Sequence, residues 1–285
     1  MHIAGIWQLQ DPMFEKVCKF PMPAMMRTIW NYRGFVLGSV KREFQIKYRN
    51  SLLGAAWTIL NPLSMILVYT VIFSQVMRAK LPGVNSSFAY SIYLCSGVLT
   101  WGLFAEITGR AQTVFLENAN LIKKINFPRI CLPVVLVLNA LINFSIIFGL
   151  FSLFLILSGN FPGWPYVSII PVLLVQIAFS IGLGMTMGVL NVFFRDIGHF
   201  FVIFLQFWFW FTPVIYPVTI LPERVKWLLV LNPLAAPIMT YQRVLVHGQW
   251  PEWGSLAPIS LMALLLCMIG IRMFRTHVGE MVDEL

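Results

Sequence analysis

Long stretches of this chain contain no charged residue, and this feature limits its fold more than any other. Residues 130–194 form a run of 65 residues without Asp, Glu, Lys or Arg, and shorter runs cover 50–77, 81–105, 197–222 and 253–271. Only 11% of the residues are charged, against about 25% in a typical soluble domain. So little charge cannot cover a water-facing surface, which argues against a soluble enzyme, a disordered chain and a secreted disulfide-rich domain. We expect an all-α integral membrane protein.

The uncharged runs also predict the number of membrane spans. A helix needs about 20 mainly apolar residues to cross a bilayer. The longest run has room for two such helices, separated by the Gly- and Pro-rich segment 158–165. The sequence therefore predicts six transmembrane helices, at 55–77, 87–108, 132–157, 167–191, 198–216 and 254–273. The apolar stretch 227–242 is too short to span and is expected to be broken by Pro233 and Pro237, forming re-entrant helices between spans five and six.

The basic residues predict the orientation. With six spans, 15 of the 20 Lys and Arg residues lie on the side of the chain termini. The positive-inside rule then places both termini in the cytoplasm, and it accounts for the net charge of +9 without a nucleic-acid partner. We divide the chain into a cytoplasmic extension at 1–24, an amphipathic helix and gate segment at 25–50, a transmembrane domain at 51–275 and a cytoplasmic tail at 276–285.

Two segments outside the spans are distinctive. Apolar residues recur every three or four positions from Met25 to Phe44, with Arg27, Lys41 and Arg42 largely on the other side. This pattern is typical of a helix that lies along a membrane surface, either as a cuff around a pore entrance or as a plain anchor. The segment 117–129 is expected to form a short exposed helix that Pro128 ends. It suits docking into a soluble partner, although an ordinary charged loop has the same composition.

Residues within the spans carry further signals. Nine of the seventeen residues from Phe200 to Tyr216 are aromatic. Aromatic faces stack on the C–H faces of sugar rings, so such a ladder could let a glycan slide, but the same rings also serve as lipid-facing or core residues. Glu106 and Arg110 are four residues apart and can pair on one helix face. Asn139 and Asn143 are expected to hold helices together. The sequence has no P-loop and no evident catalytic constellation, so we expect a subunit that is not an enzyme.

Several separate motifs carry a resemblance to a known family. They are KYRNSLLG at 47–54, Trp57, Asn61-Pro62, the segment 117–129, FFRDI at 193–197, TPVIYP at 212–217 and Asn232-Pro233-Leu234. With these motifs in this order, the chain resembles the membrane subunit of ABC exporters of the second type, in the polysaccharide branch. That branch includes the Wzm-type O-antigen permeases, which it resembles most, the KpsM-type capsule permeases and the TagG-type teichoic acid permeases. The resemblance covers roughly residues 27–275 and leaves residues 1–24 without an account.

The resemblance implies a partnership and a place. The chain would form a homodimer in the bacterial inner membrane, joined to two copies of a cytoplasmic ATP-binding subunit. It would hold no cofactor itself, because ATP and Mg²⁺ would bind to that partner. The substrate would be a polysaccharide linked to a polyprenyl diphosphate in the lipid bilayer. A capsule or teichoic acid permease, a drug or lipid exporter of the same fold, and a membrane-embedded glycan-modifying transferase remain alternatives.

The resemblance also implies roles for particular residues. The coupling helix that docks on the ATPase would contain Asn118, Asn120, Leu121, Lys123, Lys124 and Phe127. The cytoplasmic gate would contain Arg42, Lys47, Tyr48 and Arg49, whose positive charges could receive the diphosphate. Spans one and five would line the glycan channel with Trp57, Tyr69, Phe204, Phe207, Trp208, Phe211 and Tyr216, and 217–253 would form the periplasmic gate.

Overall fold

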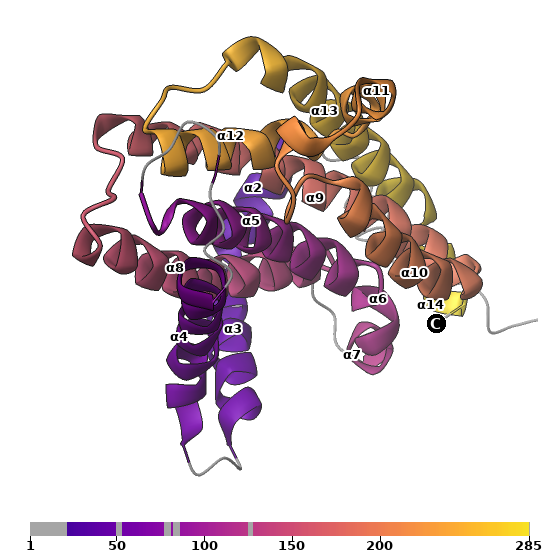
Figure 1. Cartoon of the computed structure of the whole chain (residues 1–285). Coiled ribbons are helices and arrows are strands. Elements are labelled where there is room, and N and C mark those ends of the chain that lie inside the picture. Colours follow the sequence, from indigo (N-terminus) through magenta and orange to yellow (C-terminus); the bar gives the residue numbers. More distant parts are fainter. Residues whose placement is uncertain (1–21, 50–52, 77–80, 82–85, 125–127, 285) are drawn as a thin grey trace, which may run out of the picture.

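The computed structural model describes residues 22–49, 53–76, 81, 86–124 and 128–284. The regular structure of these residues is entirely helical, which confirms the all-α prediction for the described part of the chain (Figure 1). Most of the expected extension at 1–24 lies outside the described residues, as do Asn50 and Phe127.

Within the described residues, five helices are long and apolar enough to cross a membrane. They are α4 (Trp57–Thr70) with the π-helical turn η2 (Val71–Val76), α5 (Ala89–Ala111), α8 (Cys131–Leu157), α9 (Ile169–Phe193) preceded by η3 (Trp164–Ser168), and α13 (Trp253–His277). They coincide with the first, second, third, fourth and sixth predicted spans. The counting of uncharged runs therefore located five spans correctly, because a bilayer-spanning helix excludes charge from its middle.

The fifth predicted span is shorter than expected. Helix α10 (Asp196–Phe211) has 16 residues, whereas the sequence predicted a helix that continues to residue 216. It ends because Thr212 is extended, with φ −106° and ψ 137°, the conformation that a following proline favours. At about 1.5 Å per residue, α10 measures about 24 Å, slightly less than the hydrocarbon core of about 30 Å.

The apolar stretch at 227–242 is divided between two helices. Helix α11 (Glu223–Leu231), preceded by the turn η4 (Val218–Ile220), is joined to α12 (Ala235–His247) through Asn232, Pro233 and Leu234. The predicted break at Pro233 is therefore confirmed. The break at Pro237 is wrong, because Pro237 lies in the first turn of α12, where the missing N–H would have had no helical partner.

Helix α5 occupies the centre of the bundle. It contacts α4, α8, α9 and α12, and Ser91, Ser96, Thr100 and Thr108 on it are all buried. Three of these hydroxyls donate to backbone carbonyls one turn back in the same helix: Ser96 to Tyr93, Thr100 to Ser96 and Thr108 to Phe104, at 2.6–2.8 Å. Local bonds of this kind let a helix bury polar side chains without partners on other helices.

Small residues bring α9 against its neighbours. A methyl group at Gly182 would lie 2.6 Å from the backbone nitrogen of Cys267 in α13, and one at Gly184 would lie 2.6 Å from the Ala111 side chain of α5. A methyl group at Gly188 would lie 2.5 Å from the Ala111 carbonyl oxygen. The spacing of Gly184 and Gly188 therefore marks a real helix contact, since only glycine lets the backbones approach so closely.

The amphipathic segment at 25–50 forms two helices rather than one. Helix α2 (Met22–Asn31) and helix α3 (Arg33–Tyr48) meet at Tyr32. The apolar stripe does not face lipid alone, since Val36 and Val40 of α3 are buried in one cluster with two residues of α8, Cys131 and Val135. Helix α3 is therefore packed on the transmembrane bundle.

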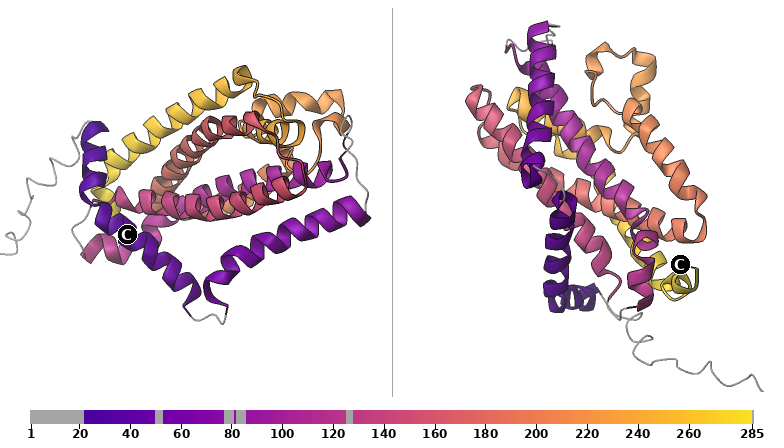
Figure 2. Two further views of the ribbon diagram at one scale, coloured as in Figure 1. Left: turned by 90° about the vertical axis from the view of Figure 1, so that its left-hand side faces the viewer. Right: turned by 90° about the horizontal axis from the view of Figure 1, so that it is seen from below.

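The edges of the bundle are formed by α4 and α10. Helix α4 contacts α5 and α8, whereas α10 contacts α5 and α9. Figure 1 and the right-hand view of Figure 2 show the two helices on opposite sides of the chain, with α5 between them. The short helices α6 (Val114–Glu117), α7 (Ala119–Lys124) and α14 (Glu280–Glu284) lie at the end of the bundle away from α11 and α12 (Figure 1).

Candidate functional site

A network of polar side chains connects helix α3 to the spans α5 and α8. The Arg110 guanidinium of α5 lies 2.7 Å from the Glu43 carboxylate of α3 and 4.0 Å from the Glu106 carboxylate. On α8, the Asn139 amide donates to Glu43 and the Asn143 amide donates to Glu106 at 3.0 Å. The predicted Glu106–Arg110 pair and the interhelical role of both asparagines are thus confirmed. Glu43 is the member that the sequence did not indicate, because it is separated from Arg110 by 67 positions.

The gate residues lie around the end of α3. Arg42 and Arg49 are both exposed, and Arg49 follows directly after the helix. The side chains of Lys47 and Tyr48 lie outside the described part of the structure. The two described cations are therefore free to face solvent or headgroups, as a phosphate-binding role requires.

The coupling segment forms a short helix as the sequence predicts. Asn118 precedes α7, and its carbonyl accepts the first turn's N–H groups from Leu121 and Ile122, at 3.0 and 2.9 Å. Its side chain does not cap α7 but donates back to the Val114 carbonyl at 2.8 Å. Ile122 is buried, whereas Asn120 and Lys123 are exposed. The helix is thus anchored by one face and presents the other. Phe127 and the side chain of Lys124 are not described.

A C-terminal helix supports the coupling segment from behind. Helix α14 contacts α7 and α9, with Met281 buried between them. The Arg129 guanidinium donates to the Val278 carbonyl at 2.5 Å, and Phe115 stacks on Phe274 with ring centroids 5.5 Å apart. The tail at 276–284 is therefore packed against the short helices α6 and α7.

The aromatic residues of α10 divide between two faces. Phe204, Phe207 and Phe211 are 41, 62 and 61% exposed in the single chain, and Phe200 and Trp210 are exposed as well. Phe200 stacks on Phe204, with ring centroids 6.2 Å apart. These rings form a continuous apolar surface that no other part of the described chain covers.

Trp208 differs from its aromatic neighbours. Its ring lies against Phe104 of α5, with centroids 5.2 Å apart, and also contacts Trp101 and Phe179. Its indole N–H donates to the Asn232 side chain at 2.9 Å. Within the single chain, Trp208 therefore packs inward and fixes α10 to the bundle, whereas Phe204, Phe207 and Phe211 face outward.

The two aromatic candidates on α4 also differ. Trp57 begins the helix and is 47% exposed. Tyr69 is half-buried, packs against the central core and lies 6.4 Å from the Phe73 ring by centroids. The exposed surface of α4 is mainly apolar, with Leu60, Leu63 and Leu67, and it includes the polar residues Asn61 and Ser64.

The turn at 212–217 is held by side chains from other helices. The Tyr93 hydroxyl of α5 donates to the Tyr216 carbonyl at 2.9 Å, and the Tyr90 hydroxyl donates to the Ile215 carbonyl at 3.0 Å. The Gln242 amide of α12 donates to the Pro213 carbonyl at 3.0 Å. The Tyr216 hydroxyl donates to the Trp210 carbonyl at 2.9 Å. Nothing in the sequence linked Tyr90, Tyr93 or Gln242 to this turn.

Asn232 connects the turn to the helices on both sides. Its side-chain oxygen accepts from Trp208 and from the Leu234 backbone at 2.9 and 3.0 Å, and its amide donates to the Thr212 hydroxyl at 2.8 Å. One side chain therefore joins the end of α10, the turn and the start of α12, which explains why asparagine is suited to the Asn232-Pro233-Leu234 motif.

These features define a class of protein. Long apolar helices, a basic helix packed at one end, and an exposed aromatic helix at the edge are typical of a multi-pass membrane protein. The chain belongs to the ABC-2 type transporter family, whose profile matches residues 36–246. This confirms the resemblance that the sequence motifs indicated.

Individual relatives are named for export. The chain is 30% identical to the O-antigen export system permease protein RfbA of Myxococcus xanthus over 266 residues, which is 93% of this chain and all of that protein. It is 28% identical to the O-antigen export system permease protein RfbA of Klebsiella pneumoniae over 82% of this chain and 88% of that protein. It is 21% identical to the polysialic acid transport protein KpsM of Escherichia coli over 85% of this chain and 93% of that protein.

Proposed function

We propose that this chain is the permease subunit of an ATP-driven exporter that moves a lipid-linked polysaccharide, specifically O-antigen, across the bacterial inner membrane. The single observation that carries the proposal is the similarity to an O-antigen export permease over that protein's whole length. The exposed aromatic face of α10 is consistent with it, because stacking on rings holds sugars without fixing one orientation. The lower similarity to a polysialic acid transporter makes capsule export the second candidate.

The proposal includes six spans with both termini in the cytoplasm. Helix α10 is the fifth span, and the turn at 212–217 supplies the rest of the membrane thickness beyond its 16 residues. Helices α11 and α12 form re-entrant elements on the periplasmic side. The distribution of Lys and Arg supports this orientation.

The proposal also requires a second copy of the chain. Helices α4 and α10 expose apolar faces on opposite edges of the bundle, and a two-fold axis would bring α4 of one protomer near α10 of its partner. The channel would then lie between these helices, lined by Trp57, Phe204, Phe207 and Phe211. Trp208 and Tyr69 would support the wall from behind.

The energy for export would come from a separate subunit. Helix α7 exposes Asn120 and Lys123 at the cytoplasmic end and is backed by α14 and the buried Ile122. Two copies of an ATP-binding protein would dock on the two coupling segments, and ATP and Mg²⁺ would bind there rather than to this chain.

Deletion of the gene tests the proposal. Cells should accumulate finished, lipid-linked glycan in the cytoplasm and lose it from the surface, as measured by fractionation and glycan electrophoresis. A shortened or undecorated glycan on the surface would instead indicate a glycan-modifying transferase. Normal surface glycan would contradict both interpretations.

A further inference from the structure

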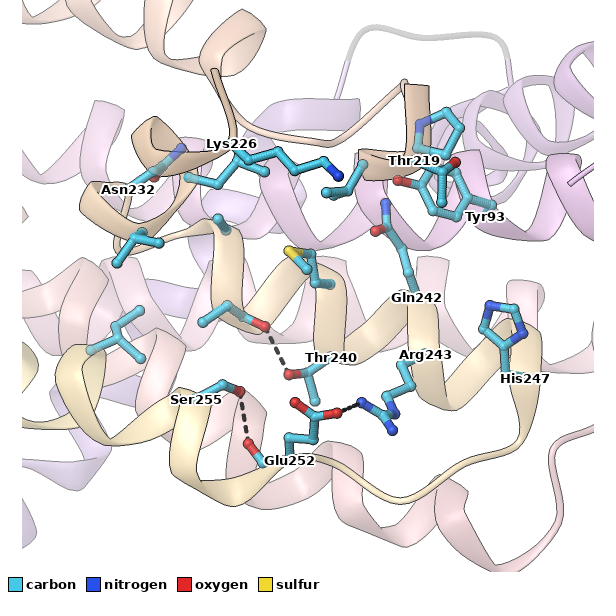
Figure 3. A pocket seen from close by; sticks show the side chains of 18 of the residues that line it. Tyr93, Thr219, Lys226, Asn232, Thr240, Gln242, Arg243, His247, Glu252 and Ser255 are labelled. Atoms are coloured by element: carbon cyan, nitrogen blue, oxygen red, sulfur yellow. Dashed lines mark hydrogen bonds and ion pairs between the residues drawn. The ribbon is translucent and has the colours of Figure 1, made fainter. Parts of the chain in front are cut away.

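A cavity of about 740 Å³ lies between α11, α12 and the start of α13, at the end of the bundle away from α7 (Figure 3). Pockets that bind small molecules have volumes of about 300–1,000 Å³. The inner wall is well ordered by packing, since Ala235, Thr240 and Ile259 on it are all buried. The cavity is therefore formed by packed helices, and it is partly open to its surroundings.

Polar groups of both kinds line this cavity. Figure 3 shows Lys226, Thr219 and Gln242 along one side and Arg243 with Glu252 along the other. The Lys226 ammonium is paired with the Glu223 carboxylate at 2.5 Å, and the Arg243 guanidinium is paired with the Glu252 carboxylate. The cavity thus offers hydrogen-bond donors and acceptors, while the charges of these two cations are already balanced.

The remaining wall is apolar. It includes Pro233, Ala236, Met239 and Pro258. A fatty acyl chain would place the Lys226 ammonium and the Glu252 carboxylate against hydrocarbon, which costs free energy. An anion would have to compete with carboxylates for both cations. An uncharged polyhydroxyl ring fits better, because it has hydroxyls at its edge and C–H groups on its faces.

The cavity lies beside the end of α10. Asn232 lines the cavity, and its amide also donates to the carbonyl of Phe211, the last residue of α10, at 3.2 Å. Pro217, at the end of the turn that follows α10, lines the cavity as well. A chain that leaves the exposed rings at Phe211 would therefore meet this cavity next.

We propose that the cavity is a subsite for a short stretch of uncharged sugar residues of the exported glycan, on the periplasmic side of the membrane. The inference rests on the proposed function and adds a specific contact site to it. The Lys226 ammonium, the Glu252 carboxylate and the Thr219 hydroxyl hydrogen-bond the sugar hydroxyls, and Met239 and Pro258 contact the ring faces. Such a site holds the emerging chain and lowers the chance that it slips back.

Cysteine accessibility tests this proposal in intact cells. Ala236→Cys places a thiol in the cavity, and Ser87→Cys places one on an exposed turn before α5 that does not line it. Each variant is treated with a membrane-impermeant maleimide, in cells that export the glycan and in cells in which glycan synthesis is blocked. The unsubstituted protein gives the background from the native cysteines, of which Cys95 and Cys131 are buried and Cys267 is half-buried within α13.

Glycan in the cavity should slow the labelling of Ala236→Cys about fivefold in exporting cells, whereas Ser87→Cys should label equally in both strains. Equal labelling of Ala236→Cys in both strains, with normal surface glycan, would overturn the subsite and leave the proposed export function intact. Protection in both strains would also overturn it, because a lipid or a second copy of the chain would then fill the cavity. Failure of Ser87→Cys to label would contradict the periplasmic location.

A second pair of variants separates binding from simple shielding. Lys226→Met removes the ammonium without stranding a buried charge, because the side chain of its partner Glu223 is 85% exposed. Arg224→Met removes an exposed cation of the same helix that does not line the cavity. In the Ala236→Cys background, Lys226→Met should reduce the protection about threefold, and Arg224→Met should leave it unchanged. Protection that survives both substitutions would show that the glycan covers the cavity without binding in it.

Discussion

Replacement of Asn232 by alanine should loosen the junction between α10 and α12. The side chain makes hydrogen bonds to Trp208, Leu234, Phe211 and Thr212, at 2.8–3.2 Å. A net contribution of about 1 kcal/mol for each bond would give about 4 kcal/mol. Because Asn232 is only half-buried, water can replace part of this, so we expect a loss of about 2–3 kcal/mol. Much of that cost comes from the indole N–H of Trp208, which loses its acceptor.

Thermal unfolding of the purified protein in detergent measures this loss. A change of 1 kcal/mol shifts the Tm of a chain of this size by roughly 2–4 °C, so Asn232→Ala should lower the Tm by roughly 4–12 °C. Asn232→Asp keeps an oxygen for Trp208 and Leu234 but loses both donated bonds, and it should lie between the native and alanine proteins. Asn118→Ala, which loses one side-chain bond to a backbone carbonyl, is the matched control.

Two results would refute the reasoning about Asn232. A Tm of Asn232→Ala within a degree of the native protein would mean that water satisfies these groups fully. A Tm of Asn232→Asp below that of Asn232→Ala would mean that the bonds accepted from Trp208 and Leu234 are unimportant.

Three further substitutions give independent tests. Gly97→Ala places a methyl group 2.6 Å from the Val214 carbonyl oxygen, so it should displace the turn and reduce surface glycan. The methyl group of Gly102→Ala, in the same helix, meets nothing within 4 Å, so this variant should be neutral. Equal effects of the two variants in a glycan blot would refute the packing argument. Arg110→Ala removes the cation that pairs with two carboxylates. Because the guanidinium is 41% exposed, a destabilisation of about 1 kcal/mol is expected in a denaturation titration. A destabilisation indistinguishable from zero would contradict a stabilising role of this network. Replacement of Lys47 and Arg49 together should block export while the complex with the ATPase still assembles in a pull-down; normal surface glycan would exclude their proposed role as a diphosphate site.

Local sequence patterns were sufficient for the spans and insufficient for their contacts. The uncharged runs located α4, α5, α8, α9 and α13, because the cost of charge in a bilayer acts on each segment separately. The end of α10 was misplaced by five residues, since the apolar run continues through a turn that only the backbone of Thr212 reveals. Pro237 was predicted to break a helix because the sequence does not show where α12 begins. That start depends on Asn232 and Leu234, and it places Pro237 in the first turn.

The candidate site shows the same division. Helical spacing grouped the aromatic residues of α10, but it could not tell which rings face the bundle. Trp208 turns inward because Asn232 lies 24 positions away to accept its N–H, a pairing that no local pattern contains. The same holds for Glu43, whose partners on α5 and α8 are 67 and 96 positions distant.

The central position of α5 has a consequence for biosynthesis. It is the least apolar of the five spanning candidates, yet 72% of its most apolar window is buried inside the chain. When α5 leaves the ribosome, α8, α9 and α12, which later surround it, have not been made. Ser96, Thr100 and Thr108 must therefore meet lipid first, with their hydroxyls bonded only within their own helix. The insertion machinery has to hold this helix until the later spans are made. A chain that lacks α9 should therefore fail to insert α5 stably, before any effect on transport can be seen.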